Sequence, residues 1–450
     1  MTPLDLRDEA QRAVEWVRGR AGAPAAEVYL YRGESRSFEL RDGRPHTRQH
    51  SAELGMGLRL FAGGRMGFAS AGGLGADVLP RLYELAASQL RLLPVDEHRA
   101  LPVPSKEAPG APKALEDPSI MEGPLSAQEP RLRELQEKVL GADKRIRKIL
   151  EAAYGEGRSE VAIASSAGLL STERSTHCGV ALEALAEQDG ETQVGSGSRS
   201  ARRVDALDFG RAAEEAVQRT TALLGSKRVP TRRRAVLFDP WAAGEILDLL
   251  AGALSADAVQ RGKSLFKGRL GQAVASPLVS LVDDPLMDGG LSSSRFDDEG
   301  LPTRRKEMLR AGELREFFYD SYTASKDARA SNGCASRSGY KGLPSPGPSN
   351  FHLAPGASKR ADLLSGTRDG LLVLELLGMH TADPISGEFS VGVGGLAVED
   401  GKLTHGVKGA MLSGNLLDLL GRVDAVADDL VFYGSLAAPT FRVADLMVAG

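Results

Sequence analysis

The stretch LGMGLRLFAGGRMGFAS, residues 54–70, indicates how the N-terminal part of the chain folds. Apolar side chains recur at every second position on both sides of Gly63-Gly64, which is typical of strands that have one face in a core. A glycine pair between two such runs favours a tight hairpin turn. The stretch therefore predicts a β-hairpin with strands at residues 56–61 and 66–70.

A second hairpin is predicted just upstream, because Asp42-Gly43 follows the alternating run at residues 28–40. Helices are predicted on either side of these strands, at residues 6–17 and 77–90, where apolar residues follow the spacing of one helical face. Residues 94–130 contain eight prolines and predict a long surface excursion. Further along, the sequence predicts a helix at 128–140, an extended segment at 146–170 with a turn at 155–157, a strand pair at 180–194 with a turn at 189–190, and a helix at 208–224.

The polar segment GSKRVPTRR, residues 225–233, is the expected domain boundary. After it, a short strand at residues 236–238 leads to Asp239 and Pro240, an N-cap and a first-turn proline. The following helix carries an apolar stripe of Ile246, Leu249, Leu250 and Leu254. From about residue 265 onward, glycine and short apolar runs predict many strands. The predicted fold class is α+β, with an N-terminal α/β domain of hairpins and helices at residues 1–228 and a C-terminal β-dominated domain at 229–450.

Composition excludes several classes of protein. The formal charge is −4 and the pI is near 6.1, which does not suit a nucleic-acid binder with a basic field. Two cysteines, Cys178 and Cys334, can form neither a disulfide framework nor a zinc knuckle. No window reaches the ~18 apolar residues that a membrane helix needs, and residues 1–19 do not form a signal peptide. We expect a cytoplasmic protein without nucleic-acid or membrane partners.

Two groups of residues suggest metal binding only weakly. His46 and His50 are four apart, but this spacing places two histidines on one face only in a helix, and the surrounding pattern is that of strands. The acidic group Asp297, Asp298 and Glu299, followed by Gly300, offers oxygen ligands for a hard cation. Aspartate and glycine also dominate turns, and from the residues alone a turn is the favoured interpretation of this group. The residues alone therefore predict a two-domain protein without a recognisable active site.

Several short motifs, taken together in order, resemble the TldD/PmbA family. The most specific is Phe296–Gly300, with Pro302-Thr303 and then Gly312-Glu313-Leu314. Others are Gly57-Leu58-Arg59, the glycine-rich hairpin at 63–70, Gly262-Lys263-Ser264, Asp283-Asp284-Pro285, the segment SGEFS at 386–390, Ser413-Gly414-Asn415 and the terminal Val448-Ala449-Gly450. The resemblance covers nearly the whole chain and is strongest after residue 236.

The resemblance implies one of two kinds of subunit. The TldD kind holds zinc with a helical HExxxH motif and a later cysteine, whereas the TldE/PmbA kind lacks both. Here Leu247, Asp248 and Gly252 stand where the motif would be, and no cysteine follows Cys334. The resemblance therefore implies a TldE/PmbA-like chain with no catalytic residue, metal or cofactor of its own. It implies a homodimer or a heterodimer with a zinc-bearing TldD-like partner, and leader or unfolded peptides as substrates of the assembly.

Alternatives stay open at this stage. Gly378, His380, Ser386, Gly387, Phe389 and Ser390 either border a peptide chamber or form an ordinary turn between strands. The chain could be a stand-alone structural homodimer without peptidase activity. It could also be an independent hydrolase that uses Asp297, Asp298, Glu299 and His380. The family's older label as a modulator of DNA gyrase suggests a nucleic-acid or topoisomerase partner, which the charge balance does not favour.

Overall fold

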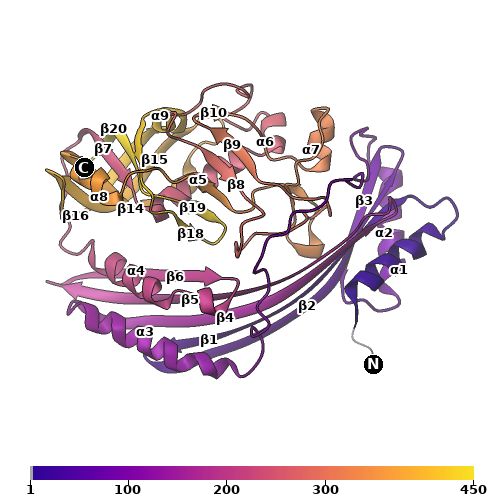
Figure 1. Ribbon diagram of the computed structural model, residues 1–450, viewed down its shortest axis with the longest axis horizontal. Helices are drawn as coiled ribbons and strands as arrows, with labels where there is room; N and C mark the ends of the chain where they lie inside the picture. Colours follow the sequence, from indigo (N-terminus) through magenta and orange to yellow (C-terminus); the bar gives the residue numbers. More distant parts are fainter. Residues whose placement is uncertain (1–3) are drawn as a thin grey trace.

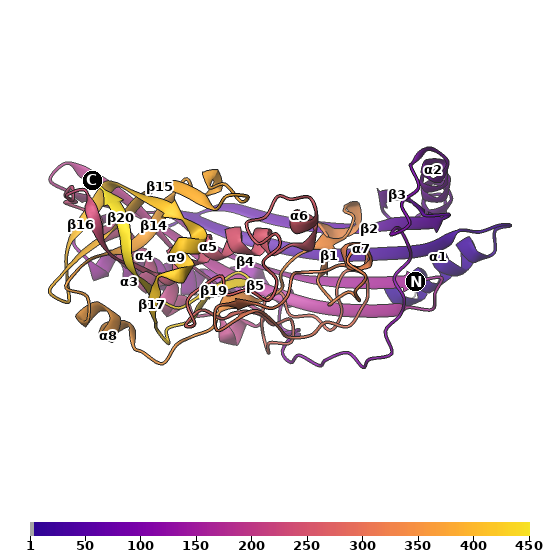
Figure 2. The same ribbon diagram turned by 90° about the horizontal axis from the view of Figure 1, so that it is seen from above.

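The computed structural model describes residues 4–450 and shows a long curved sheet with a second region lying on its concave side (Figure 1). The sheet is antiparallel throughout, in the order β3-β2-β1-β4-β5-β6. Its strands are β1 (Ala25–Arg41), β2 (Arg44–Ala62), β3 (Arg65–Gly72), β4 (Ile146–Ser165), β5 (Leu170–Gln188) and β6 (Glu191–Ala201). Seen from above, these strands run along the length of the molecule (Figure 2).

The predicted hairpin turns at Asp42-Gly43, Gly63-Gly64 and Asp189-Gly190 lie between paired strands. The predicted turn at residues 155–157 is wrong, because β4 passes through it without interruption. One of the two glycines there, Gly157, serves the packing of the sheet instead. A Cβ on Gly157 would lie 2.6 Å from Cε1 of His177 on the neighbouring strand. The chain turns later, between Ser165 and Leu169.

Two helix pairs cover the convex face of the sheet at its two ends (Figure 1). They are α1 (Leu6–Arg18) with α2 (Val78–Leu92), and α3 (Glu129–Ala142) with α4 (Phe209–Thr221). Each pair packs on side chains from alternate positions of the strands, such as Val28 and Leu30 under α1 and Phe38 and Leu40 near α3. The four predicted helices are therefore present. The opposite, concave face is left to the C-terminal region.

Between α2 and the short helix η1 (Leu125–Gln128), the proline-rich excursion contains neither helix nor strand. It nevertheless makes specific contacts with both regions. Asp96 accepts a hydrogen bond of 2.7 Å from the hydroxyl of Tyr322 in the C-terminal region. Farther along, Leu115 accepts one of 3.0 Å from the backbone N–H of Thr176 on β5. The excursion is thus a strap that runs from one region to the other.

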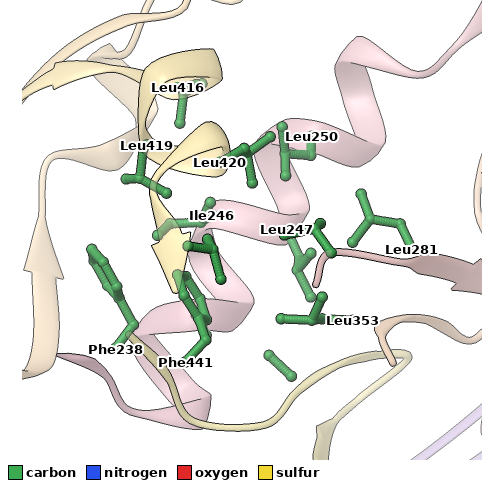
Figure 3. Close-up of a cluster of buried hydrophobic side chains, with 14 of the residues drawn as sticks. Phe238, Ile246, Leu247, Leu250, Leu281, Leu353, Leu416, Leu419, Leu420 and Phe441 are labelled. Atoms are coloured by element: carbon green, nitrogen blue, oxygen red, sulfur yellow. The ribbon is translucent and has the colours of Figure 1, made fainter. Parts of the chain in front are cut away.

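The C-terminal region begins with β7 (Arg232–Phe238) and α5 (Pro240–Ala253). Asp239 caps α5 by accepting from the backbone N–H of Trp241, as predicted. A second sheet has the order β16-β15-β14-β7-β20-β17, with β14 at Asp369–Leu377, β15 at Glu388–Glu399, β16 at Lys402–Asn415, β17 at Val423–Val426 and β20 at Phe441–Ala449. This sheet closes on itself through additional pairing of β16 with β20. Its interior packs against α5, where Phe238 stacks on Phe441 with ring centroids 4.9 Å apart (Figure 3). This core fixes which side of α5 faces outward.

The remaining elements are mostly short. The strands are β8 (Leu281–Asp283), β9 (Lys306–Arg310), β10 (Glu313–Leu314), β11 (Ala335–Ser336), β12 (Ser345–Pro346), β13 (Phe351–Leu353), β18 (Val431–Tyr433) and β19 (Leu436–Ala438). The helices are α6 (Ala256–Gln260), α7 (Ser321–Lys326), α8 (Arg360–Ser365), α9 (Leu416–Gly421), η2 (Val204–Ala206), η3 (Gly339–Lys341) and η4 (Met379–Thr381). The predicted α+β class is confirmed. Within residues 4–450, no helix has the length and apolar character needed to cross a membrane.

Candidate functional site

A cleft of about 490 Å³ lies along the outer side of α5. Its far wall comes from the end of β14, from η4 and from strands β18 and β19. The lining residues are Trp241, Gly244, Glu245, Asp248 and Leu249 of α5, with Leu376, Gly378, Met379, His380, Tyr433 and Leu436. The α5 residues follow the three- and four-residue spacing of one helical face. The cleft therefore uses the side of α5 that the core leaves free.

The three α5 positions at which the family resemblance places the HExxxH motif lie in different surroundings in the structure. Leu247 is 3% exposed and packs in the core with Ile246 and Leu250 (Figure 3). Asp248 lines the cleft. Gly252 is exposed in the last turn of α5, and it is not among the lining residues. Only Asp248 therefore presents a side chain to the cleft.

Residues 378–390 divide into a cleft part and a turn part. Gly378 has a positive φ of 91° and starts η4, which places His380 in the cleft wall. The hydroxyl of Ser386 donates to Asp383, and Gly387 has a positive φ of 81°, so this part is a tight turn. The last two residues belong to β15, where Phe389 is buried in the core and Ser390 pairs with Ser413. The cleft thus contains Gly378 and His380 and none of the other four.

Aromatic and charged residues define the electrostatics of the cleft. Trp241 and Tyr433 meet edge to face with ring centroids 4.9 Å apart. Arg219 reaches them from α4, lying 4.4 Å above the Trp241 ring and donating a 3.1 Å hydrogen bond to the Tyr433 hydroxyl. Burial, with a contribution from the negative charge of Glu375, raises the pKa of Glu245 to about 7. Arg199 of β6 also lies 5.2 Å from the centre of the Tyr433 ring, so the N-terminal region supplies two arginines to this aromatic pair.

Sequence reasoning did not single out Trp241, Glu245, Tyr433 or Arg219. A usable signal existed for the first two, because Trp241, Glu245 and Asp248 lie on one face of the predicted helix and interrupt its apolar pattern. Arg219 and Tyr433 approach α5 only through tertiary folding, since they are more than 200 residues apart. No local sequence pattern predicts the contact between Arg219 and Tyr433.

The raised pKa of Glu245 predicts a pH-dependent stability. Because the native state binds this proton more tightly than the unfolded chain, the carboxyl favours folding below its ordinary pKa of 4.5. That contribution is lost as the pH rises through 7. Relative to Glu245→Gln, the wild-type chain should therefore lose stability between pH 5 and pH 8, as measured by urea unfolding midpoints. Glu84→Gln on the exposed face of α2 controls for net charge, and parallel wild-type and Glu245→Gln profiles would contradict the prediction.

The acidic segment 297–300 lies elsewhere, at the contact between the two regions. Asp297 accepts hydrogen bonds from the backbone N–H groups of Glu299, Leu301 and Ala335 at 3.0–3.2 Å. Asp298 accepts from the Tyr29 hydroxyl at 3.1 Å. These contacts join the segment to its own loop and to β1.

Glu299 and Gly300 complete the attachment to the N-terminal sheet. Glu299 receives Arg59 of β2 at 3.2 Å and the backbone N–H of Ser321 at 2.8 Å. The carbonyl of Gly300 accepts from the Ser171 hydroxyl at 3.0 Å. Burial raises the pKa of Asp297 and of Asp298. The segment does not meet His380, which lies in the α5 cleft, and the carboxylates of Asp298 and Glu299 bind the C-terminal region to the N-terminal sheet.

The histidine pair His46 and His50 lies exposed on β2. The ring of His50 contacts Glu34 at 2.9 Å, as expected for a polar sheet face. Catalytic zinc requires three protein ligands drawn from imidazole, thiolate or carboxylate groups. Across residues 4–450, no three His, Cys, Asp or Glu side chains come close enough to share a metal ion. The donor set of the cleft therefore does not fit a catalytic zinc site.

Comparison with known proteins gives matches that together span most of the chain. The PmbA/TldA metallopeptidase domain 1 matches residues 26–89, the central domain of the same family matches 116–224, and its C-terminal domain matches 231–450. Metalloprotease PmbA of Escherichia coli O157:H7 is 24% identical over 447 residues, covering 99% of this chain and 96% of that protein. Metalloprotease MJ0996 of Methanocaldococcus jannaschii is 26% identical over 416 residues, with 90% of each chain covered.

Solved structures give the same picture of the fold. TM0727 from Thermotoga maritima has a TM-score of 0.89 at 26% identity, covering 99% of this chain and 100% of that one. TldE from Thermococcus kodakarensis has a TM-score of 0.88 at 21% identity, again covering 99% and 100%, and shares the fold. The likeness therefore extends over both regions of the molecule.

Proposed function

The chain belongs to the PmbA/TldD metallopeptidase family, and on this premise we propose that it is the subunit without a zinc site in a two-chain peptidase. In this proposal a TldD-like partner would hold zinc, and the metal would supply the Lewis-acid chemistry for peptide hydrolysis. The chain described here closes the chamber in which peptides are cleaved and helps to hold them extended. Leader peptides and unfolded peptides are the proposed substrates.

One observation carries the proposal, namely what α5 presents to its cleft. Side chains at two of the three expected motif positions cannot ligate a metal, because Leu247 packs in the core and Gly252 has no side chain. In their place the cleft is walled by Trp241, Glu245 and Tyr433. An aromatic and acidic wall of this kind suits binding of a peptide better than activation of water.

The carboxylates that an independent hydrolase would need are engaged in other contacts. Asp297 accepts three backbone N–H groups, and Glu299 is bound by Arg59. This arrangement favours a structural role for the segment, so we do not propose that second function. A stand-alone homodimer without peptidase activity is the outcome that the following experiment separates from the proposal.

The test combines metal content with partner-dependent cleavage. We expect the purified chain to contain well under one zinc per chain by mass spectrometry and to leave an unfolded casein-type peptide intact. Adding a TldD-like homologue should produce chelator-sensitive cleavage that the homologue alone does not show. A homologue that is fully active by itself would contradict the proposal. Stoichiometric metal with cleavage by this chain alone would contradict it as well.

A further inference from the structure

A cavity of about 740 Å³ lies on the concave face of the long sheet, apart from the α5 cleft. Its floor is formed by small uncharged residues of four adjacent strands. Ser37, Gly155, Gly179 and Ser200 lie in one register line from β1 to β6, and Ser35 lies in the next line. The floor therefore offers hydroxyl groups and open space across the full width of four strands.

The same strands carry long charged side chains on their other face. Arg32 pairs with Glu160 there, and Arg158 pairs with Glu34 at 2.6 Å. Side chains at alternate positions of a strand point to opposite faces, so the residues on the concave face can differ in kind from those on the other face. At the floor of the cavity, the concave face therefore carries small uncharged residues, although the other face of the same strands is highly charged. Hydroxyl groups at this spacing can both donate to and accept from a polypeptide backbone without selecting its side chains.

One buried cation at the end of this floor has no anionic partner. Arg202 is 7% exposed and borders the cavity. Its guanidinium donates only to backbone carbonyls, at 3.0 Å to Gly290, at 3.1 Å to Ser293 and also to Leu291 and Thr176, and forms no ion pair with any carboxylate in the part of the chain that the structure describes. A buried charge without an ion-pair partner is costly, and the carbonyls use four of the five guanidinium N–H groups, so one N–H is left to donate to an anion.

The other charged groups that border the cavity are already paired. Arg36 contacts Glu156 at 2.6 Å, and Arg199 contacts Glu215 at the same distance. Glu173, which lies near Arg202, is held by Arg295 at 2.9 Å. Arg202 is therefore the one bordering arginine that forms no ion pair among residues 4–450, and only the more distant charge of Glu173 acts on it.

His177 lies beside Arg202 and also lacks a partner. Its neighbour Cys178 pairs with Ala201, which precedes Arg202, so the two side chains border the same end of the cavity. His177 is exposed at the cavity and forms no hydrogen bond within residues 4–450, and partial desolvation together with the charge of Arg202 lowers its pKa. A bound carboxylate would offset the positive charge of Arg202 and so favour the protonated imidazole ring. His177 is thus a built-in reporter of an anion at Arg202.

We propose that this cavity binds the C-terminal end of an extended polypeptide, with the terminal carboxylate at Arg202 and His177 and the backbone over the serine-lined floor. Guanidinium groups bind carboxylates with charge-assisted hydrogen bonds. The loop at residues 290–293 stands against Arg202 and closes this end of the cavity through Leu291, which suits a chain terminus. The inference rests on the proposed function for its peptide, and it adds which end of the peptide this chain recognises.

The test compares two forms of one labelled, unstructured peptide, with a free C-terminal carboxylate or a C-terminal amide. With the full wild-type chain, fluorescence anisotropy should show at least about tenfold weaker binding of the amide, which corresponds to one lost charge-assisted contact. Arg202→Gln should weaken the acid form to the level of the amide. Arg203→Gln removes the same charge from an ion pair with Asp205 outside the cavity and should change neither affinity.

Two further measurements keep the inference testable if Arg202→Gln folds poorly. In NMR titrations, the acid peptide should raise the pKa of His177 while the amide should not. Inorganic phosphate should compete only at far higher concentration than the peptide. Equal binding of acid and amide by the wild-type chain would overturn the inference, and so would phosphate binding as tightly as the peptide. Neither result bears on partner-dependent cleavage, so the inference about the peptide C-terminus can fail while the proposed function stands.

Discussion

Replacing Arg59 by methionine is expected to lower the free energy of unfolding by about 3–5 kcal/mol, because it leaves buried carboxylates without their counter-charge. The Arg59 side chain is 5% exposed, and those of Glu27 and Glu299 are each 2% exposed. Arg59 donates from Nε to Glu27 at 2.9 Å and from both Nη atoms to Glu299 at 3.2 Å. Methionine keeps much of the volume, so the charge is the main change.

The effect should be large because the network joins the two regions of the molecule. Arg337 of the C-terminal region also binds Glu27, and its own side chain is 1% exposed. Burial alone would raise the pKa of Glu27, but the charges of Arg337 and Arg59 hold it below its ordinary value. Removing Arg59 therefore weakens a four-residue cluster rather than a single pair.

A matched control lies in the same contact between regions. Lys341 and Glu53 form an ion pair of 2.7 Å, but their side chains are 65% and 45% exposed. Lys341→Met should change the free energy of unfolding much less than Arg59→Met, because solvent screens an exposed pair. Urea unfolding of both variants measures the difference. If Arg59→Met and Lys341→Met both lower the free energy of unfolding by the same small amount, the prediction is wrong. The buried ion pairs would then contribute no more to stability than the exposed one.

The sequence predicts features that depend on nearby residues and misses those that depend on distant ones. The hairpin at Asp42-Gly43 and the cap at Asp239 were predictable, because the turn and the N-cap are completed within a few residues. The turn predicted at residues 155–157 was wrong, because β4 continues through it and Gly157 makes room for the neighbouring strands. A glycine in an extended segment can indicate either a turn or the close approach of a neighbouring strand, and only the tertiary structure distinguishes the two.

The candidate site was predictable in part for the same reason. Asp248, Gly378 and His380 were singled out and do meet in one cleft, while Asp297 to Glu299 lie at the contact between regions. The Tyr29–Asp298 hydrogen bond joins residues 269 positions apart. A sequence pattern shows that such residues are polar, but it does not show whether they face a cleft or a buried partner.

The way α4 packs on the sheet predicts a second large effect, for Gly197→Ala on β6. An added Cβ at this position would lie 2.0 Å from the carbonyl oxygen of Ala212 and 2.7 Å from the backbone nitrogen of Ala216, both in α4. Backbone atoms cannot rotate away, so the helix has to move. We expect a loss of about 3 kcal/mol, at the upper end of what overpacking costs, measured by urea unfolding.

The same substitution should reach the cleft, because α4 carries Arg219 over the ring of Trp241. The chain has only two tryptophans, so in a Trp16→Phe background the emission reports on Trp241 alone. Gly197→Ala should shift that emission as α4 moves away from the sheet. Gly155→Ala is the control, since its nearest contact would be an ordinary 3.7 Å, and it should change neither stability nor emission much. A destabilised Gly197→Ala chain with unchanged Trp241 emission would mean that the helix shifts without moving Arg219. The long sheet would then not determine the geometry of the cleft.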